Sequence, residues 1–250
     1  MAGSQKDFEM AKYLLVAEGP TDHVIISELA VKLSDLQGRL IEVVELAPQA
    51  DATNGSYPAF GLSAVEKWCK RYRVRTPEEL EAVPAVIRET LRRNTWKGML
   101  GIQGADGIII QMDNDIAHEI STVAAFIPGT CRSTHCKTAM TSWLGESTLP
   151  DDVYLAISAV ATETWILAAY APDNAVFADL PKPINYEQIE NCEERLIALG
   201  LRSKMKKGKR RLLKSPYTIY EPYAKTVVEN LAAVRERCPA LDSLCNHLSR

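Results

Sequence analysis

The chain has two acidic segments whose carboxylates are placed where they could act together on a bound ligand. They are Glu18 and Asp22, which follow the apolar run 13–17, and Asp113 and Asp115, which follow the apolar run 107–112. Each run predicts a buried strand, so the carboxylates come where a strand ends. Because parallel strands deliver their carboxyl ends to one edge of a sheet, we expect all four side chains at that edge.

Carboxylates gathered in this way repel one another, and a hard divalent cation is their usual partner. The expected cofactor is Mg²⁺ or Mn²⁺, held by Glu18, Asp22, Asp113, Asp115 and, from the flank after a fourth apolar run, Glu163. Two such ions would clamp the attacking and leaving oxygens of a phosphodiester. The alternative is a set of solvated loop acids, since Asp and Glu are common after strands. The occurrence of both segments, each after an apolar run, favours a site.

Length and composition suit one large globular domain, with or without an elaboration. The chain has 250 residues, is 46% hydrophobic and 24% charged, and has a formal net charge of −3, so any nucleic-acid contact must come from a local patch. No apolar run approaches the roughly 20 residues that span a bilayer. The polar start, residues 1–12, lacks a secretory pattern, so we expect a cytoplasmic protein without membrane contact.

Strand and helix patterns alternate over the first two thirds of the chain. Strands are expected at 13–17, 40–46, 107–112 and 153–160, and helices at about 20–38, 63–73, 77–93, 115–126, 138–144 and 161–170, with a loop at 51–61. Helices near 186–199, 221–237 and 239–248 follow. This order predicts an α/β parallel sheet flanked by helices over residues 1–172, and a helical extension with a basic segment over 173–250.

Together, the two acidic segments resemble the Toprim domain, which occurs in topoisomerases, bacterial primases, recombination proteins and OLD-type nucleases. The similarity lies in Glu-Gly-Pro-Thr-Asp after Tyr-Leu-Leu-Val-Ala, and in Asp-Asn-Asp after Gly-Ile-Ile-Ile-Gln-Met about ninety residues later. Asp22 makes the first motif more similar to the OLD-type and related small nucleases. The motifs are clear over roughly 12–170.

Two later segments resemble small stand-alone bacterial Toprim proteins, many of them encoded with antiphage defence genes. Glu163-Thr-Trp-Ile-Leu-Ala is similar to their Glu-x-Trp segment, and Tyr223-Ala-Lys225 to their Tyr-x-Lys segment. The resemblance implies a Rossmann-like sheet, Glu18 as general acid/base or metal ligand, and Asp113 and Asp115 as metal ligands. It also favours Lys225 as a charge stabiliser over a plain surface lysine.

Residues 202–214 form a strongly basic stretch, with eight Lys or Arg among thirteen residues. We expect a flexible or helical arm that grips a nucleic-acid backbone through Lys204, Lys206, Lys207, Lys209, Arg210 and Arg211. A solvated basic loop, or one that docks on an acidic partner, is the alternative.

The sequence therefore predicts a Toprim-type, metal-dependent nuclease acting on DNA or RNA. By analogy with related defence systems, a partner such as an ATPase would control it. Two alternatives stay open: a non-catalytic subunit that binds nucleic acid or a partner, and a nucleotidyl transferase such as a primase.

Overall fold

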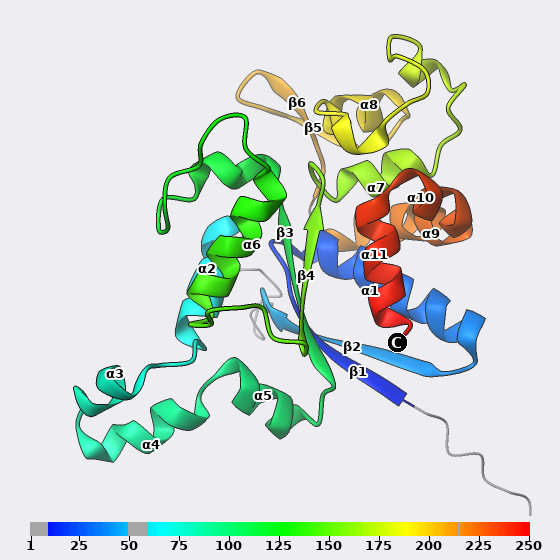
Figure 1. Cartoon of the computed structure of the whole chain (residues 1–250). Coiled ribbons are helices and arrows are strands. Elements are labelled where there is room, and N and C mark those ends of the chain that lie inside the picture. Colours follow the sequence, from blue (N-terminus) through cyan, green and yellow to red (C-terminus); the bar gives the residue numbers. More distant parts are fainter. Residues whose placement is uncertain (1–9, 50–59, 215) are drawn as a thin grey trace, which may run out of the picture.

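The computed structural model describes residues 10–49, 60–214 and 216–250 and contains one four-stranded sheet (Figure 1). Its strands are β1 (Met10–Val16), β2 (Leu40–Ala47), β3 (Gly107–Asp113) and β4 (Val153–Ser158). All neighbours pair in parallel, in the order β2-β1-β3-β4. The predicted α/β class with a parallel, Rossmann-like sheet is therefore confirmed. The expected loop at 51–61 lies almost wholly outside the described residues.

Helices cover both faces of this sheet, as parallel connections require. One face carries α1 (Pro20–Gln37), α7 (Glu163–Ala168), α9 (Glu221–Glu229), α10 (Leu231–Arg237) and α11 (Pro239–Leu248) (Figure 1). The other carries α2 (Leu62–Arg71), α5 (Trp96–Gln103) and α6 (Arg132–Trp143), while α3 (Pro77–Glu81) and α4 (Ala85–Arg93) extend away from the sheet on that side. Short 3₁₀ turns, η1 to η4, cover Asp115–Glu119, Ala175–Phe177, Tyr186–Gln188 and Tyr217–Tyr220.

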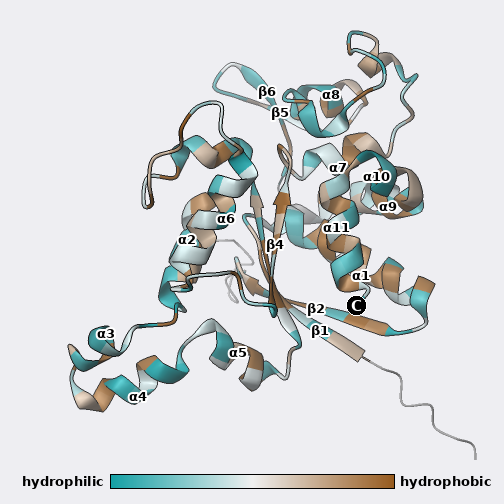
Figure 2. Ribbon diagram, viewed as in Figure 1, coloured by the Kyte–Doolittle hydropathy of each residue, from teal (hydrophilic) through white to brown (hydrophobic). Residues whose placement is uncertain are grey.

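Alternating side chains of the strands enter two separate cores. Along β1, Tyr13 and Leu15 pack under α1 and the C-terminal helices, whereas Leu14 and Val16 pack under α2 and α6. Burial on both faces explains the continuous apolar runs seen in the sequence. Figure 2 shows these strands as mainly hydrophobic and the outward surfaces of the helices as mixed.

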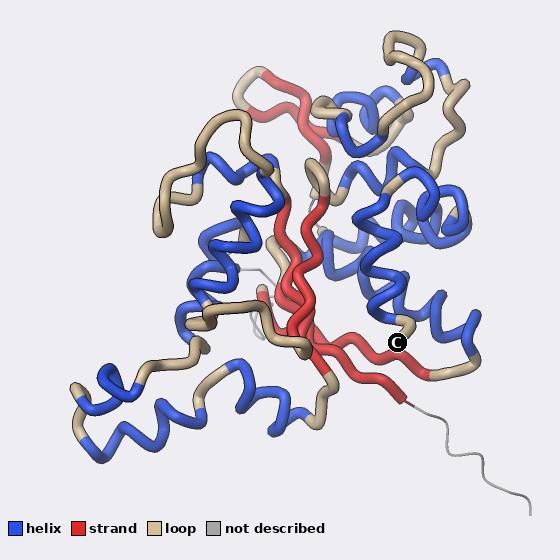
Figure 3. Tube along the Cα trace, viewed as in Figure 1, coloured by secondary structure: helices blue, strands red, loops and turns tan. Residues whose placement is uncertain are grey.

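The segment after residue 172 shares the core of the sheet. Helix α9 packs on α1, and α11 packs on β4 and α1. The same segment contains α8 (Cys192–Ala198) and an antiparallel hairpin of β5 (Ser203–Lys206) and β6 (Lys209–Leu212). Figure 3 shows this hairpin as a separate pair of strands beyond the carboxyl edge of the main sheet.

Five sequence predictions were wrong in detail. The basic stretch is a hairpin and not a helical or flexible arm, because Lys207 and Gly208 both take positive φ values, 50° and 75°, and form a two-residue turn. The expected helix at 115–126 is only the turn η1, and the expected helix at 77–93 is divided into α3 and α4. The expected helix near 186–199 is divided into η3 and α8, and that at 221–237 into α9 and α10. No helix in the described ranges is long and apolar enough to cross a membrane.

Candidate active site

Glu18 and Asp113 meet where the two central strands end. Glu18 follows β1, and Asp113 is the last residue of β3, the neighbouring strand. The Asp113 backbone N–H donates to Glu18 Oε1 at 3.1 Å, and the Glu18 N–H donates to Gln111 Oε1 at 3.0 Å. The strand order reverses between β1 and β3, and such a switch point is where open α/β sheets bind ligands.

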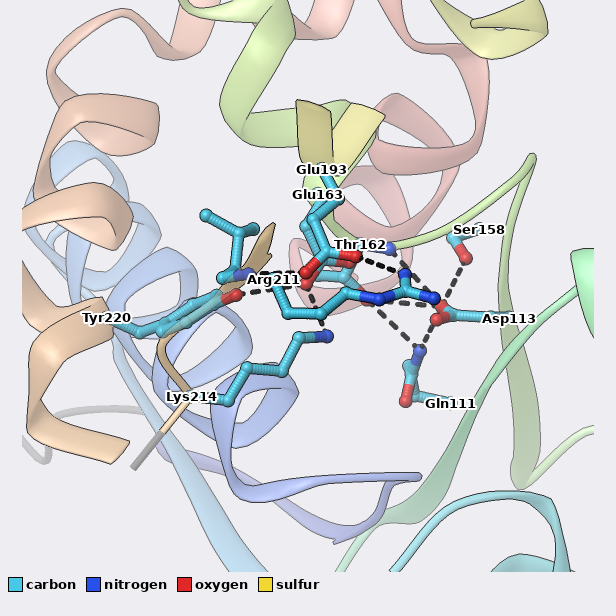
Figure 4. A network of polar contacts seen from close by, with 10 residues as sticks. Gln111, Asp113, Ser158, Thr162, Glu163, Glu193, Arg211, Lys214 and Tyr220 are labelled. Atoms are coloured by element: carbon cyan, nitrogen blue, oxygen red, sulfur yellow. Dashed lines mark hydrogen bonds and ion pairs between the residues drawn. The ribbon is translucent and has the colours of Figure 1, made fainter. Parts of the chain in front are cut away.

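One oxygen of Asp113 is fixed by a shell of donors. Asp113 Oδ1 accepts from Ser158 Oγ at 2.6 Å, from Gln111 Nε2 at 3.0 Å, and from the Thr162 backbone N–H and hydroxyl at 3.2 and 3.3 Å (Figure 4). These bonds leave Asp113 Oδ2 without a donor among the described residues. The carboxylate is thus held in one orientation with one oxygen available to a ligand.

Asp22 is buried in the first turn of α1, close to the turn that follows β1. A Cβ atom at position 19 would lie 3.3 Å from Asp22 Oδ2, which is unusually close. Gly19 therefore leaves the space in which the Asp22 carboxylate comes near the strand ends.

Glu163 lies at the start of α7 with two partners of its own. Lys214 Nζ lies 2.5 Å from Glu163 Oε1, and the Tyr220 hydroxyl donates to the same oxygen at 3.0 Å (Figure 4). The Glu163 side chain is 8% exposed, whereas that of Lys214 is 53% exposed. Lys214 thus reaches from the end of the hairpin into the acidic cluster with its ammonium group.

Burial and mutual repulsion disfavour ionisation of four carboxyls, including Asp115, whose pKa is raised by burial and by Glu163. Burial, Asp113 and Asp22 together raise the pKa of Glu18 to about 9. Burial and the neighbouring Glu163 raise the pKa of Asp22, and burial with Asp22 and Glu163 raises the pKa of Asp113 well above its usual range. Burial also acts to raise the pKa of Glu163, but Lys214 outweighs it and the pKa is lowered. The cluster therefore contains more carboxyl groups than the one ammonium group of Lys214 can neutralise.

Two cavities open on Asp113, and both are also lined by Lys209, Arg211 and Lys214. The larger, of about 1000 Å³, is also lined by Glu18 and Asp22. The smaller, of about 630 Å³, is also lined by Asp115 and Glu163. The chain turns after Asp113, so Asp115 begins η1 and faces the smaller cavity.

The basic residues of the hairpin line these cavities. Lys204, Lys206, Lys207, Lys209 and Arg211 line the larger one, and Arg210 lines the smaller one. Arg211 also pairs with Glu193 of α8 at 2.6 Å.

Lys225 lies elsewhere. It is exposed on α9 and lines neither cavity, and the lysine at the carboxylates is Lys214. Sequence reasoning also missed the side chains that orient Asp113. Their one signal was polarity at buried positions: Gln111 interrupts the apolar run of β3, and Ser158 ends β4.

The donor set fits a hard cation held by few protein ligands. Among the described residues, no three His, Cys, Asp or Glu side chains form a ready-made metal site. Mg²⁺ commonly binds through one or two carboxylates together with waters and substrate phosphates. Asp113 Oδ2 and the second oxygen of Glu18 are suited to that role, and a cation would relieve the repulsion that raises their pKa values.

Comparisons with protein-family models, curated proteins and solved structures find no match to this chain.

Proposed function

We propose that this protein is a divalent-metal-dependent nuclease that cleaves phosphodiester bonds of DNA or RNA. The observation that carries the proposal is the meeting of Glu18 and Asp113 at the strand switch point, with a basic hairpin across the cavity from them. The carboxylates suit a metal, and the hairpin suits the phosphates of a nucleic acid. The resemblance to the Toprim domain supports the same interpretation.

The metal ion, the carboxylates and Lys214 would each contribute to cleavage. Mg²⁺ or Mn²⁺, when bound, would polarise a phosphate oxygen and lower the pKa of a water. Asp113 and Glu18 would hold the ion, with Asp22, Asp115 and Glu163 around it. Without metal, burial and the neighbouring Asp113 and Asp22 raise the pKa of Glu18 to about 9; a bound cation would favour its ionised form, which would serve as a ligand and as a general base. Lys214 would stabilise negative charge on the phosphate in place of Lys225.

One observation favours a second function. The Lys214 ammonium already neutralises Glu163, so this carboxylate has a cation without any metal. A non-catalytic subunit that binds nucleic acid or a partner would need no metal and would have this arrangement.

Cleavage assays separate the two. Purified protein is incubated with plasmid, single-stranded DNA and tRNA, each with Mg²⁺, Mn²⁺ or EDTA. We expect cleavage that requires metal and that Glu18→Gln lowers by about 10²–10⁴-fold, a range typical for loss of general acid/base catalysis. Glu119→Gln, an exposed acid on η1, is the matched control. Binding without cleavage under all conditions would support the second function.

The defence role and the ATPase partner extend this proposal by resemblance. A neighbouring ATPase gene, and cleavage that appears only when its product is added, would support them.

A further inference from the structure

The two cavities beside Asp113 differ in charge. The larger is lined by six basic side chains, Lys204, Lys206, Lys207, Lys209, Arg211 and Lys214, against four acidic ones. The smaller is lined by six acidic side chains, Asp113, Asp115, Glu163, Glu190, Glu193 and Glu194, against four basic ones. A polyanion therefore reaches Asp113 more favourably through the larger cavity.

The hairpin register places like charges opposite one another on the side of the larger cavity. Lys204 pairs with Arg211, and Lys206 pairs with Lys209, so all four share one face of the hairpin. Like charges directly across two strands destabilise the pairing. Lys204, Lys206 and Lys209 form no ion pair within the described chain, so phosphates placed on this face would relieve the repulsion.

An aromatic ring lies on the same cavity. Phe60 lines it and is 66% exposed, so its ring is accessible from the cavity. Such a ring stacks on an unpaired base. In a duplex every base is already stacked and paired, and its extraction costs free energy.

We propose that the larger cavity binds a single strand of nucleic acid, with its phosphates on the hairpin lysines and a base stacked on Phe60. The inference rests on the proposed function and names its substrate class. The volume of about 1000 Å³ is at the upper end of the range for ligand sites and leaves room for a short segment of one strand.

The test is the binding of labelled oligonucleotides, followed by fluorescence anisotropy in EDTA so that no cleavage occurs. The probes are a 12-nucleotide DNA strand, the matching RNA strand and the 12-base-pair duplex. We expect one or both single strands to bind at least about tenfold more tightly than the duplex, and the two strands decide between DNA and RNA. Phe60→Leu should weaken single-strand binding at least about fivefold, whereas Phe60→Tyr should retain it. Ile102→Ala, at an exposed apolar position on α5 that lines neither cavity, is the control.

The outcomes separate this inference from the proposed nuclease activity. Equal or tighter binding of the duplex, equal affinities for Phe60→Leu and wild type, or no binding to any probe would overturn the inference. Single-strand binding that depends on Phe60, without cleavage in any metal, would uphold it while the nuclease proposal fails. Metal-dependent cleavage without a preference for single strands would uphold the nuclease proposal and overturn this inference.

Discussion

The acidic strand ends and the basic hairpin face each other across one cavity, yet their charges are in different environments. Asp22 and Glu163 are buried, and burial raises the pKa values of Glu18, Asp22 and Asp113. Lys204, Lys206 and Lys209 are exposed on the hairpin. Buried charges alter stability and its pH dependence, whereas exposed charges alter the affinity for a polyanion and its salt dependence. Substitutions in the two regions should therefore change different measurements.

A large effect on stability is expected where Lys214 joins the two regions. Lys214→Met leaves Glu163 buried without its ammonium partner. Removing one member of a fully buried pair costs about 3–5 kcal/mol, and because Lys214 is half exposed and Tyr220 still donates, we expect about 2 kcal/mol. The measurement is urea unfolding.

Two variants check the cause of that destabilisation. The double variant Lys214→Met/Glu163→Gln should recover most of the stability, since it removes the unpaired charge. Lys225→Met, at an exposed lysine on α9, should stay within about 0.5 kcal/mol of wild type. If the two single lysine variants are equally destabilised, Lys214 is not a partner of the cluster.

An effect on binding, and not on stability, is expected from the exposed hairpin charges. Changing Lys204, Lys206 and Lys209 together to Gln should reduce the slope of log affinity for a single strand against log salt by about 2, at ~0.7 for each phosphate that is no longer neutralised. Thermal stability should change little. The measurement is a salt titration of binding to a labelled oligonucleotide.

Arg92→Gln/Arg93→Gln provides the matched control, because these exposed arginines lie on α4, far from the hairpin (Figure 1). If the hairpin variant and wild type have equal slopes, the hairpin does not grip the backbone.

A further effect is expected in the pH dependence of the metal-free protein. Glu18 has a pKa of about 9 in the folded state against an ordinary value of 4.5. Between these values the folded protein holds a proton that the unfolded chain has released, so stability falls as pH rises from about 5 to about 9. Glu18→Gln cannot ionise, and its melting temperature in EDTA should increasingly exceed that of wild type over this range. A difference that stays constant with pH would contradict the raised pKa.

The sequence predicted the elements that local patterns encode. Apolar runs located all four strands of the main sheet, and Gly38, in the left-handed conformation, ends α1 where the sequence placed its end. Strand ends then brought Glu18 and Asp113 together, because parallel strands share a carboxyl edge.

The features that the sequence did not predict depend on distant parts of the chain. The residues after η1 have helical spacing, but Thr122 accepts from the Trp143 indole N–H at 2.8 Å, and the chain packs there without continuing a helix. The hairpin turn was missed because lysine, and not Asn or Asp, precedes Gly208. Lys214 meets Glu163 only through the path of the chain after β6, and no local pattern encodes that ion pair.

The central claim is that the carboxylates at the ends of β1 and β3 bind a divalent cation. Titration calorimetry with Mn²⁺, without nucleic acid, tests it directly on wild type, Asp113→Asn and the control Glu119→Gln. We predict saturable binding to wild type and to the control, with a melting temperature that rises with Mn²⁺ concentration, and at least about tenfold weaker binding to Asp113→Asn. No saturable binding to wild type, or equal binding to Asp113→Asn, would contradict the account.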